Sequence, residues 1–189
     1  ELHHTQKYAF GELLEMAAGK SDFDESFGAL ARAVCSQPFR LTHRDYHSRN
    51  LMVRGGGNLT VLDFQDARLG PAAYDLASLV FDSYVSLPDS LREELITRFI
   101  DRTGIAAVAD AETFRTRLSW TALQRNLKAI GTFAHQKTAH GTSRYLRHIP
   151  PALAHIQCHL AALPGTEDLA DRLAPYLDAL ETALGEITD

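Results

Sequence analysis

Apolar side chains recur every three or four residues along most of the chain, the spacing of helices that bury one face. Phe23, Phe27 and Leu30 share such a face near the start. Helices of this kind are predicted over residues 5–18, 22–34, 74–86, 89–103, 110–139 and 150–163, with a helical pair over 166–186 that is kinked near Pro175. Gly19 is expected to end the first helix, and Asp22 and Asp89 are candidate caps. The pattern predicts a mainly helical protein.

The spacing of apolar residues changes between residues 39 and 66. Residues 51–53 and 59–62 are short apolar runs on either side of 54–58, which contain three consecutive glycines. Glycine readily adopts the positive φ angles of a tight reversal, so this stretch predicts a β-hairpin. The glycines are not followed by Lys-Ser or Lys-Thr and open no helix, which favours a turn over a phosphate-binding loop.

Composition narrows the class of protein. The chain has 189 residues, 45% of them hydrophobic, and 19 basic residues against 24 acidic ones, for a net charge of −5. These values exclude a disordered chain and argue against a nucleic-acid partner, which requires a basic face. Two cysteines are too few for a disulfide framework, and no run approaches the roughly 20 apolar residues that span a bilayer. We expect a single domain over 1–189, located in the cytoplasm and without a membrane partner.

A run of nine mostly polar residues, 42–50, lies between apolar runs that are expected to be buried. The short hairpin folds Asn50 and Asp63, which flank its open ends, beside each other. Together they offer a neutral and a charged oxygen, the kind of ligand that Mg²⁺ selects. Asp45 lies five residues before Asn50, close enough to accept a proton from an attacking hydroxyl. This set of residues fits phosphoryl transfer, in which positioning and charge neutralisation supply most of the catalysis.

At these residues the chain resembles a known family. His43-x-Asp45-x4-Asn50 followed by Asp63-Phe64 is similar to the catalytic loop and metal-binding segment of kinase-like folds. The longer sequence of residues 43–50 and 63–66, together with the Gly-Pro-x-x-Tyr-Asp-Leu of residues 70–76, resembles that of the aminoglycoside phosphotransferase/choline kinase family. Within that family it is most similar to the anomeric kinases of N-acetylmuramate and N-acetylglucosamine, which act in cell-wall recycling. The likeness covers about residues 39–160 and includes residues 123–131 and 143–146.

The resemblance implies a fold, cofactors and residue roles. The fold would be the C-terminal lobe of a protein-kinase-like fold, mainly α with a small β-hairpin (α+β), and the cofactors would be ATP and Mg²⁺. Asp45 would be the catalytic base, and Asn50 and Asp63 the metal ligands. The supporting roles implied are loop shape for His43, a γ-phosphate contact for His47, a brace of the catalytic loop for Asp75, and, from position, amino-sugar contacts for Gln65, Asp66 and Arg125. Asp66 could equally cap the turn that follows it.

Kinases of this type also carry a β-rich N-terminal lobe with a lysine that pairs with the nucleotide phosphates. Nothing before residue 39 predicts strands, and neither Lys7 nor Lys20 lies in a Val-Ala-x-Lys context. We therefore expect this chain to be the catalytic lobe alone, with the missing N-terminal lobe as its partner. On that view the isolated chain binds ATP weakly and has little or no activity.

Two further interpretations stay open. The acceptor could be an aminoglycoside, choline or homoserine instead of an amino sugar. Cationic acceptors need carboxylates or an aromatic cage near the base, whereas Arg44, Arg49, Arg125 and Arg144 accompany the matched segments here and favour a neutral or acidic sugar. Alternatively, the chain could be a non-catalytic kinase-like module that binds a partner or metabolite.

Overall fold

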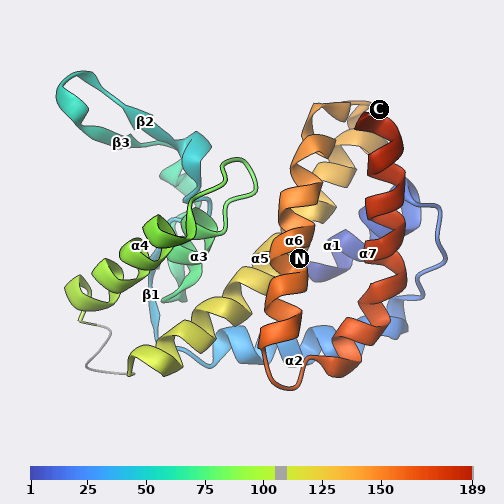
Figure 1. Cartoon of the computed structure of the whole chain (residues 1–189), viewed down its shortest axis with the longest axis horizontal. Coiled ribbons are helices and arrows are strands. Elements are labelled where there is room, and N and C mark those ends of the chain that lie inside the picture. The colour runs from blue at the N-terminus through green and yellow to red at the C-terminus, as the bar shows by residue number, and fades with distance from the viewer. Residues whose placement is uncertain (105–109, 189) are drawn as a thin grey trace. The chain divides into compact units, whose positions relative to one another are not determined.

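The computed structural model describes residues 1–104 and 110–188. The chain divides into two compact units: residues 1–32 with 123–189 form unit 1, and residues 33–122 form unit 2. Figure 1 shows that helices dominate and that the strands are few and short. The α-helices are α1 (Leu2–Thr5), α2 (Asp24–Cys35), α3 (Tyr74–Val80), α4 (Asp89–Arg102), α5 (Ala111–His140), α6 (Ile149–Ala162) and α7 (Glu167–Thr188), and the strands are β1 (Phe39–Thr42), β2 (Leu51–Val53), β3 (Leu59–Val61) and β4 (Arg68–Pro71).

The strands of unit 2 form two antiparallel pairs. Strands β2 and β3 pair with Leu51 opposite Val61, and Gly56 and Gly57 in the connecting turn have φ of +78° and +79°. This pair is the predicted hairpin, and Figure 1 shows it extending as an arm from the rest of the unit. Strands β1 and β4 pair with Phe39 opposite Pro71 and Thr42 opposite Arg68, a pairing that the sequence pattern does not predict. The described chain is therefore mainly helical with a small β-hairpin, as predicted, and it has a second antiparallel strand pair in addition.

Helices α3 and α4 and the first part of α5 enclose the core of unit 2. Its apolar side chains are at most 7% exposed, and on α4 and α5 they recur every four residues, as their periodicity predicts. This core comprises Ala72, Ala73, Leu76, Ala77, Val80, Ile96, Ile100, Phe114, Leu118 and Ala122. Helix α3 is thereby fixed along its buried face, which matters because its first turn contacts the polar loop described below.

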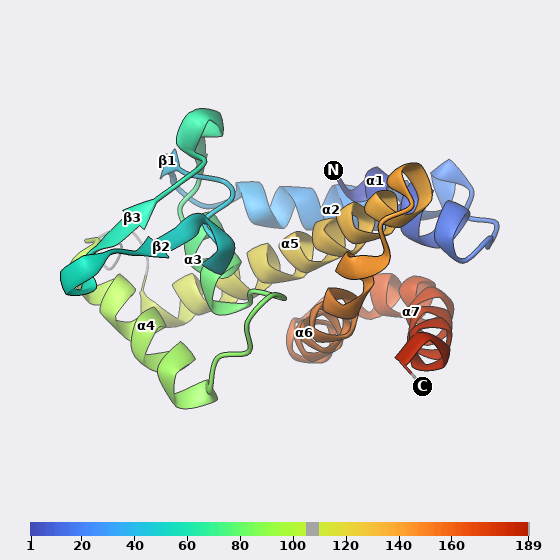
Figure 2. The same cartoon turned by 90° about the horizontal axis from the view of Figure 1, so that it is seen from above.

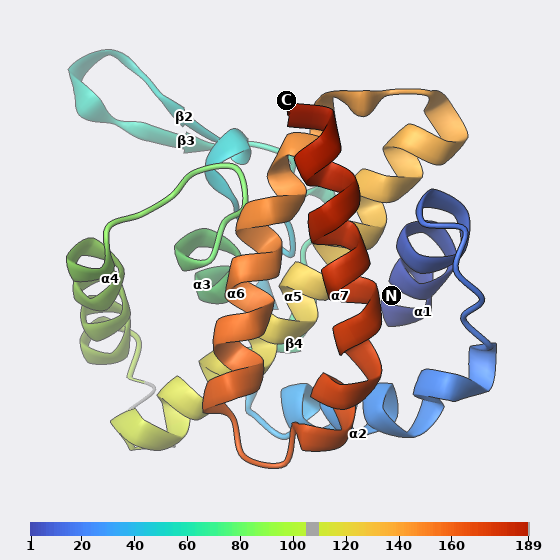
Figure 3. The same ribbon diagram turned by 45° about the vertical axis from the view of Figure 1, so that its right-hand side comes forward.

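Unit 1 is built from helices alone within the described residues. Helices α6 and α7 run antiparallel and side by side, as Figures 2 and 3 show. A cluster of aromatic rings fills part of its interior: Phe10 stacks on Tyr176 with ring centroids 4.4 Å apart, and Phe23 stacks on Phe27 at 4.9 Å. Phe10 and Phe23 are at most 1% exposed, so this cluster is a true core.

A close backbone approach in unit 1 requires glycine at position 131. A β-carbon there would lie 2.6 Å from the Thr5 Cα and 2.7 Å from the Thr5 nitrogen, and Thr5 is fully buried. We expect Gly131→Ala to destabilise the chain by roughly 2–3 kcal/mol, because backbone atoms cannot yield as a flexible side chain does. Gly28→Ala in α2 is the matched control: it meets only the tip of Arg32, so it should be neutral or stabilising by up to about 1 kcal/mol. Urea unfolding of both variants measures the difference, and equal midpoints would contradict this packing.

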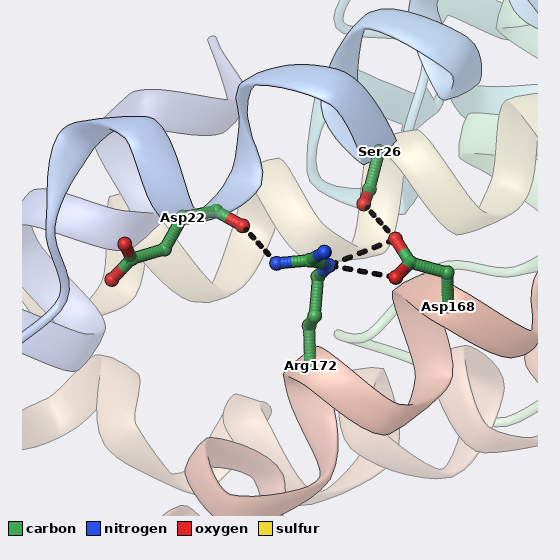
Figure 4. Close-up of polar contacts among 4 residues, drawn as sticks. All are labelled: Asp22, Ser26, Asp168 and Arg172. Carbon is green, nitrogen blue, oxygen red and sulfur yellow. Dashed lines mark hydrogen bonds and ion pairs between the residues drawn. The ribbon is translucent and has the colours of Figure 1, made fainter.

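A polar cluster joins α7 to the start of α2 in unit 1 (Figure 4). The Arg172 Nε donates to both carboxylate oxygens of Asp168 at 2.9 and 2.8 Å, and its Nη1 donates to the Asp22 carbonyl at 3.0 Å. The Ser26 hydroxyl donates to Asp168 at 2.6 Å. These hydrogen bonds, first from Arg172 and then from Ser26, hold the pKa of Asp168 below its ordinary value.

The lowered pKa of Asp168 makes the contribution of this cluster depend on pH. A carboxylate whose pKa is lower in the folded state stabilises the fold above its unfolded pKa of about 3.9, and this contribution is lost as pH falls through the folded value. We therefore expect Arg172→Gln to be less stable than wild type near neutral pH, and the gap to close on acidification. Urea unfolding midpoints of both proteins, measured at stepwise lower pH, give this difference in stability. A gap that stays constant down to the acid limit of folding would be inconsistent with this assignment.

Several boundaries differ from the sequence-based prediction. Helix α1 continues as a π-helix over Gln6–Leu13, and this first helical segment ends at Leu13 and not at Gly19. There Met16 N–H donates to the Phe10 carbonyl and Glu15 takes a left-handed φ of 54°. Helix α3 ends at Val80, not near residue 86, and the predicted C-terminal pair is one helix that continues through Pro175. The predicted cap Asp89 is wrong, since it is the first residue of α4 and bonds Arg92 instead of a backbone N–H. None of the helices that the structure describes is long and apolar enough to cross a bilayer.

Candidate active site

The polar loop that follows β1 is held to the base of the β2–β3 hairpin. Residues 48–50 form a 3₁₀ turn that leads directly into β2, and Asn50 N–H donates to the His47 carbonyl at 2.9 Å. Leu62 N–H donates to the Asn50 carbonyl at 2.9 Å, which extends the ladder by one pair beyond Leu51 and Val61. Asn50 and Leu62 are therefore neighbours across the hairpin, and Asp63 follows at its open end.

Asn50 also connects the hairpin to Asp45. Its Nδ2 donates to the Asp45 carbonyl at 2.9 Å, and His47 N–H donates to the same carbonyl at 3.0 Å. Because the amide nitrogen is engaged, the Asn50 Oδ1 is the side-chain atom left to accept a ligand. The Asp45 side chain is half-buried, and no described residue donates a hydrogen bond to its carboxylate. Asp45 thus keeps both carboxylate oxygens available.

Asp63 lies at a backbone turn that few residues adopt. Its φ and ψ are 64° and 40°, in the left-handed region, and its side chain is exposed. Gln65 Nε2 donates to Asp63 Oδ1 at 2.6 Å, and no described residue donates a hydrogen bond to the other carboxylate oxygen. Arg44, the residue before Asp45, has a φ of 78°. A non-glycine residue in this region costs on the order of 1 kcal/mol or more, and such strain often marks functional sites.

Asp75 in the first turn of α3 binds the start of the loop. Its Oδ2 accepts from His43 N–H at 2.7 Å and its Oδ1 from Arg44 N–H at 2.9 Å. Two consecutive N–H groups therefore bind one carboxylate. His43 makes a second connection, since its Nε2 donates to the Leu62 carbonyl at 2.8 Å. The loop is therefore fixed to helix α3 on one side and to the residue before Asp63 on the other.

The other candidate residues lie in different settings. The His47 ring lies edge-on to Tyr84, with centroids 5.2 Å apart. Gln65 contacts Asp63, as described above. Asp66 is exposed in the turn 64–66, and its side chain has no hydrogen bond to a described residue. Arg125 belongs to α5 in unit 1, whereas all the others belong to unit 2. The roles of these residues in substrate or phosphate binding stay predictions.

Sequence reasoning missed one residue that contacts the loop. Asp82 follows α3, is 5% exposed, and its Oδ2 accepts from Ser48 N–H at 2.8 Å. The predicted helix over 74–86 placed Asp82 inside a helix, where it would have been one more surface carboxylate. The signal that could have found it is the turn-forming pair Asp82-Ser83 directly after the apolar run 79–81.

The donor set at the base of the hairpin fits a magnesium ion. Asp63 offers an exposed carboxylate oxygen and Asn50 a neutral amide oxygen, and Mg²⁺ in phosphoryl-transfer sites takes one or two protein oxygens while water and phosphate supply the rest. No sulfur or imidazole donor is needed in such a set. The site also keeps an unpaired carboxylate, Asp45, next to it along the loop, as proton transfer from a hydroxyl requires.

Comparison with known proteins gives a family and a set of relatives. The model of the phosphotransferase enzyme family matches residues 6–112. An N-acetylmuramate/N-acetylglucosamine kinase from Pseudomonas aeruginosa is 35% identical over 148 residues, which cover 77% of this chain and 44% of that protein. The protein of the same name from Pseudomonas putida is 34% identical over 160 residues, covering 83% of this chain and 47% of the relative.

A relative of the same name from Neisseria meningitidis serogroup B is 32% identical over 138 residues, covering 71% of this chain and 41% of that protein. The chain thus spans less than half the length of these curated relatives. The family match includes the polar loop, the hairpin, Asp75 and Asp82. The site built above from hydrogen bonds therefore lies within the segment that the family model recognises.

Proposed function

The chain belongs to the phosphotransferase enzyme family, and on that premise we propose that it is the catalytic lobe of an ATP- and Mg²⁺-dependent kinase. The acceptor proposed is the anomeric hydroxyl of an N-acetylated amino sugar, N-acetylmuramate or N-acetylglucosamine. The reaction transfers the γ-phosphoryl group of ATP to that hydroxyl, breaks the bond between the γ-phosphorus and the bridging oxygen, and releases ADP.

The observation that carries this proposal is the position of Asn50. Its side-chain amide holds the Asp45 carbonyl and its main-chain carbonyl holds Leu62, the residue before Asp63. One residue thereby links the proposed base to the proposed metal ligands. A loop with a merely structural role has no need for this arrangement of a free carboxylate, a free amide oxygen and an exposed carboxylate.

Each residue has a defined part in the proposed reaction. Asp45 accepts a hydrogen bond from the attacking hydroxyl and takes its proton as the new oxygen–phosphorus bond forms. Asn50 and Asp63 would hold Mg²⁺, which neutralises negative charge on the β- and γ-phosphates when it is bound. Asp75 and His43 keep the loop in register with the hairpin through the contacts described above. The relation of His47 to the γ-phosphate remains part of the proposal.

Two observations support an amino sugar as the acceptor. The relatives from P. aeruginosa and P. putida are named N-acetylmuramate/N-acetylglucosamine kinases. The loop itself contains Arg44 and Arg49, which suit a neutral or acidic sugar better than a cationic aminoglycoside or choline. Gln65, Asp66 and Arg125 remain candidate sugar contacts. An activity of this kind would draw on cytoplasmic ATP and would return amino sugars from cell-wall turnover to metabolism.

We propose that ATP binding needs a second lobe in addition to this chain. All four lysines of the chain lie in helical segments and none lies on a strand, whereas kinases pair a strand lysine with the α- and β-phosphates. We therefore propose that a β-rich lobe outside these 189 residues completes the ATP site, and that the isolated chain binds ATP weakly. Calorimetric binding of ATP by the isolated chain in the micromolar range would speak against this arrangement.

A direct assay tests the proposed function. The complete gene product that contains this chain is incubated with ATP, Mg²⁺ and each acceptor, and ADP release is measured together with the phosphorylated product. We expect release with N-acetylmuramate or N-acetylglucosamine and little with choline, homoserine or an aminoglycoside. Release with one of the last three would change the acceptor and keep the enzyme class. No release with any acceptor would favour a non-catalytic binding module.

A further inference from the structure

A second carboxylate, Asp82, contacts the catalytic loop at the end opposite Asp75, and unlike Asp75 it is buried. Asp82 is 5% exposed and accepts two backbone hydrogen bonds, from Ser48 N–H to Oδ2 at 2.8 Å and from Tyr84 N–H to Oδ1 at 2.8 Å. Both donors are neutral amides, so the carboxylate gives charge-assisted bonds that are stronger than ordinary ones. A buried ionisable group with two such partners is held in one position.

The two carboxylates fix the loop on either side of Asp45. Asp75 binds His43 and Arg44, immediately before Asp45, and Asp82 binds Ser48, immediately after His47. Ser48 opens the 3₁₀ turn that carries Asn50 into β2. Both carboxylates belong to one short segment, since Asp75 lies in the first turn of α3 and Asp82 lies just beyond its end. Helix α3 is in turn fixed by its buried face in the core of unit 2.

Asp82 also positions an aromatic side chain beside the loop. Its bond to Tyr84 N–H, two residues further along the chain, closes an Asx turn that sets the direction of the backbone there. The Tyr84 ring then packs against the Arg49 guanidinium, with 3.9 Å between the guanidinium carbon and the ring centroid, and lies edge-on to His47. The segment 47–50 is therefore held by a hydrogen bond at Ser48 and by ring contacts on both sides of it.

We propose that Asp82 is a positioning residue for phosphoryl transfer, which fixes the second half of the catalytic loop and so places Asn50 relative to Asp45. This inference rests on the proposed function for its catalytic consequence. Asp82 touches neither substrate nor metal in this account and acts through Ser48 and the turn that follows. Because a displacement of about 1 Å in a reacting group can cost on the order of 10²-fold in rate, a loosened loop should lower turnover strongly.

The informative variant is Asp82→Asn, which keeps the size of the side chain. It replaces one accepting oxygen with an NH₂ group, so one of the two backbone N–H groups must face a donor. We expect kcat to fall about 10- to 100-fold, the KM for the sugar to stay within about twofold, and the Mg²⁺ concentration needed for half-maximal rate to rise. Asp82→Ser is the second variant. Its hydroxyl can still accept from Tyr84 N–H but is too short to reach Ser48.

Controls separate this role from a general loss of stability. Asp101→Asn changes an exposed aspartate on α4 that has no partner among the described residues, and it should behave as wild type. Kinetics are measured at a temperature where circular dichroism finds every variant fully folded. A variant that merely destabilises the fold would lower the melting temperature while keeping the wild-type Mg²⁺ dependence and kcat per folded molecule, and that outcome would overturn the proposal.

Amide hydrogen exchange gives a readout that does not depend on activity. In Asp82→Asn and Asp82→Ser, the Ser48 amide should exchange at least about tenfold faster than in wild type, while the Ala77 amide inside α3 keeps its protection. If wild type phosphorylates no acceptor, the proposed function is wrong. The Ser48 amide exchange rate alone then tests whether Asp82 holds the loop. If wild type is active and both variants keep its kcat, Mg²⁺ dependence and Ser48 exchange, the positioning role of Asp82 is wrong and the proposed function stands.

Discussion

Replacing Asp45 with asparagine is expected to lower kcat for phosphorylation of the amino sugar by about 10²- to 10⁴-fold, the usual contribution of a general base. Asparagine has nearly the same size as aspartate, and the loop contact that Asp45 makes with Asn50 uses its main-chain carbonyl, so the fold of the loop should persist. The variant loses the Asp45 carboxylate, which is the only group proposed to take the proton from the sugar hydroxyl. Steady-state ADP release by the complete gene product measures the effect.

The Asp45 experiment has a matched control and a clear contrary outcome. Asp101→Asn makes the same chemical change at an exposed position of α4 without partners among the described residues, and should leave kcat unchanged. The KM for the sugar should change far less than kcat in Asp45→Asn, because the base acts mainly in the transition state. Turnover by Asp45→Asn close to that of wild type would remove Asp45 from the role of base.

The second large effect is expected for Asp63→Ala, which should lower kcat/KM roughly 10³-fold, because metal neutralisation of phosphate charge is worth several kcal/mol. The change removes the one carboxylate among the two proposed metal ligands and leaves only the neutral Asn50 oxygen. Alanine also loses the acceptor that Gln65 now uses, which is an exposed contact of small energetic weight. The rate is measured over a series of Mg²⁺ concentrations.

Asp63→Asn tests whether the loss concerns the metal. It retains a neutral oxygen that can bind Mg²⁺, so we expect part of its lost activity to return as Mg²⁺ is raised, whereas Asp63→Ala should recover little. Asp101→Ala serves as the control for truncation of an exposed aspartate. If Asp63→Ala keeps wild-type turnover and Mg²⁺ dependence, the metal site cannot lie at the base of the hairpin.

The sequence was most informative where one physical signal dominated. The periodic apolar faces of α2, α4, α5 and α6 predicted those helices to within a few residues, and the glycines at 56 and 57 predicted the hairpin turn. Strand β4 was missed because its Gly70-Pro71 is typical of a turn. Proline is tolerated at the end of an edge strand, and a β-carbon at position 70 would lie 2.7 Å from the Thr42 hydroxyl, so glycine there serves the strand pairing.

Other boundaries could not be predicted because tertiary hydrogen bonds set them. Residues 14–18 have ordinary helical propensity, yet the Gln6 side-chain amide bonds the Gly19 carbonyl and draws this segment away from the helix. Helix α3 stops at Val80 because Asp82 serves Ser48 and Tyr84 instead of continuing the helix. The Gln6–Gly19 and Ser48–Asp82 bonds join residues 13 and 34 positions apart, so apolar periodicity does not reveal them.

In the candidate site, too, some residues could be predicted from the sequence and others could not. The types and spacing of Asp45, Asn50 and Asp63 pointed to them, since a hairpin brings its two ends together whatever the rest of the fold does. The contact of Asp75 with the loop came from resemblance alone, and Asp82 came from neither source. A carboxylate that binds backbone N–H groups leaves no requirement on the side chains of its partners, which explains why nothing in the sequence of the loop points to Asp82.

We propose that Asp45, Asn50 and Asp63 serve one reaction at the base of the hairpin. A crystal structure of the complete gene product with Mg²⁺, ADP and the amino sugar tests it most directly. We expect Asn50 Oδ1 and an Asp63 carboxylate oxygen at about 2.0–2.1 Å from the ion, and the Asp45 carboxylate within hydrogen-bond reach of the sugar hydroxyl. A metal held by other residues, or an Asp45 carboxylate directed away from the sugar, would contradict it.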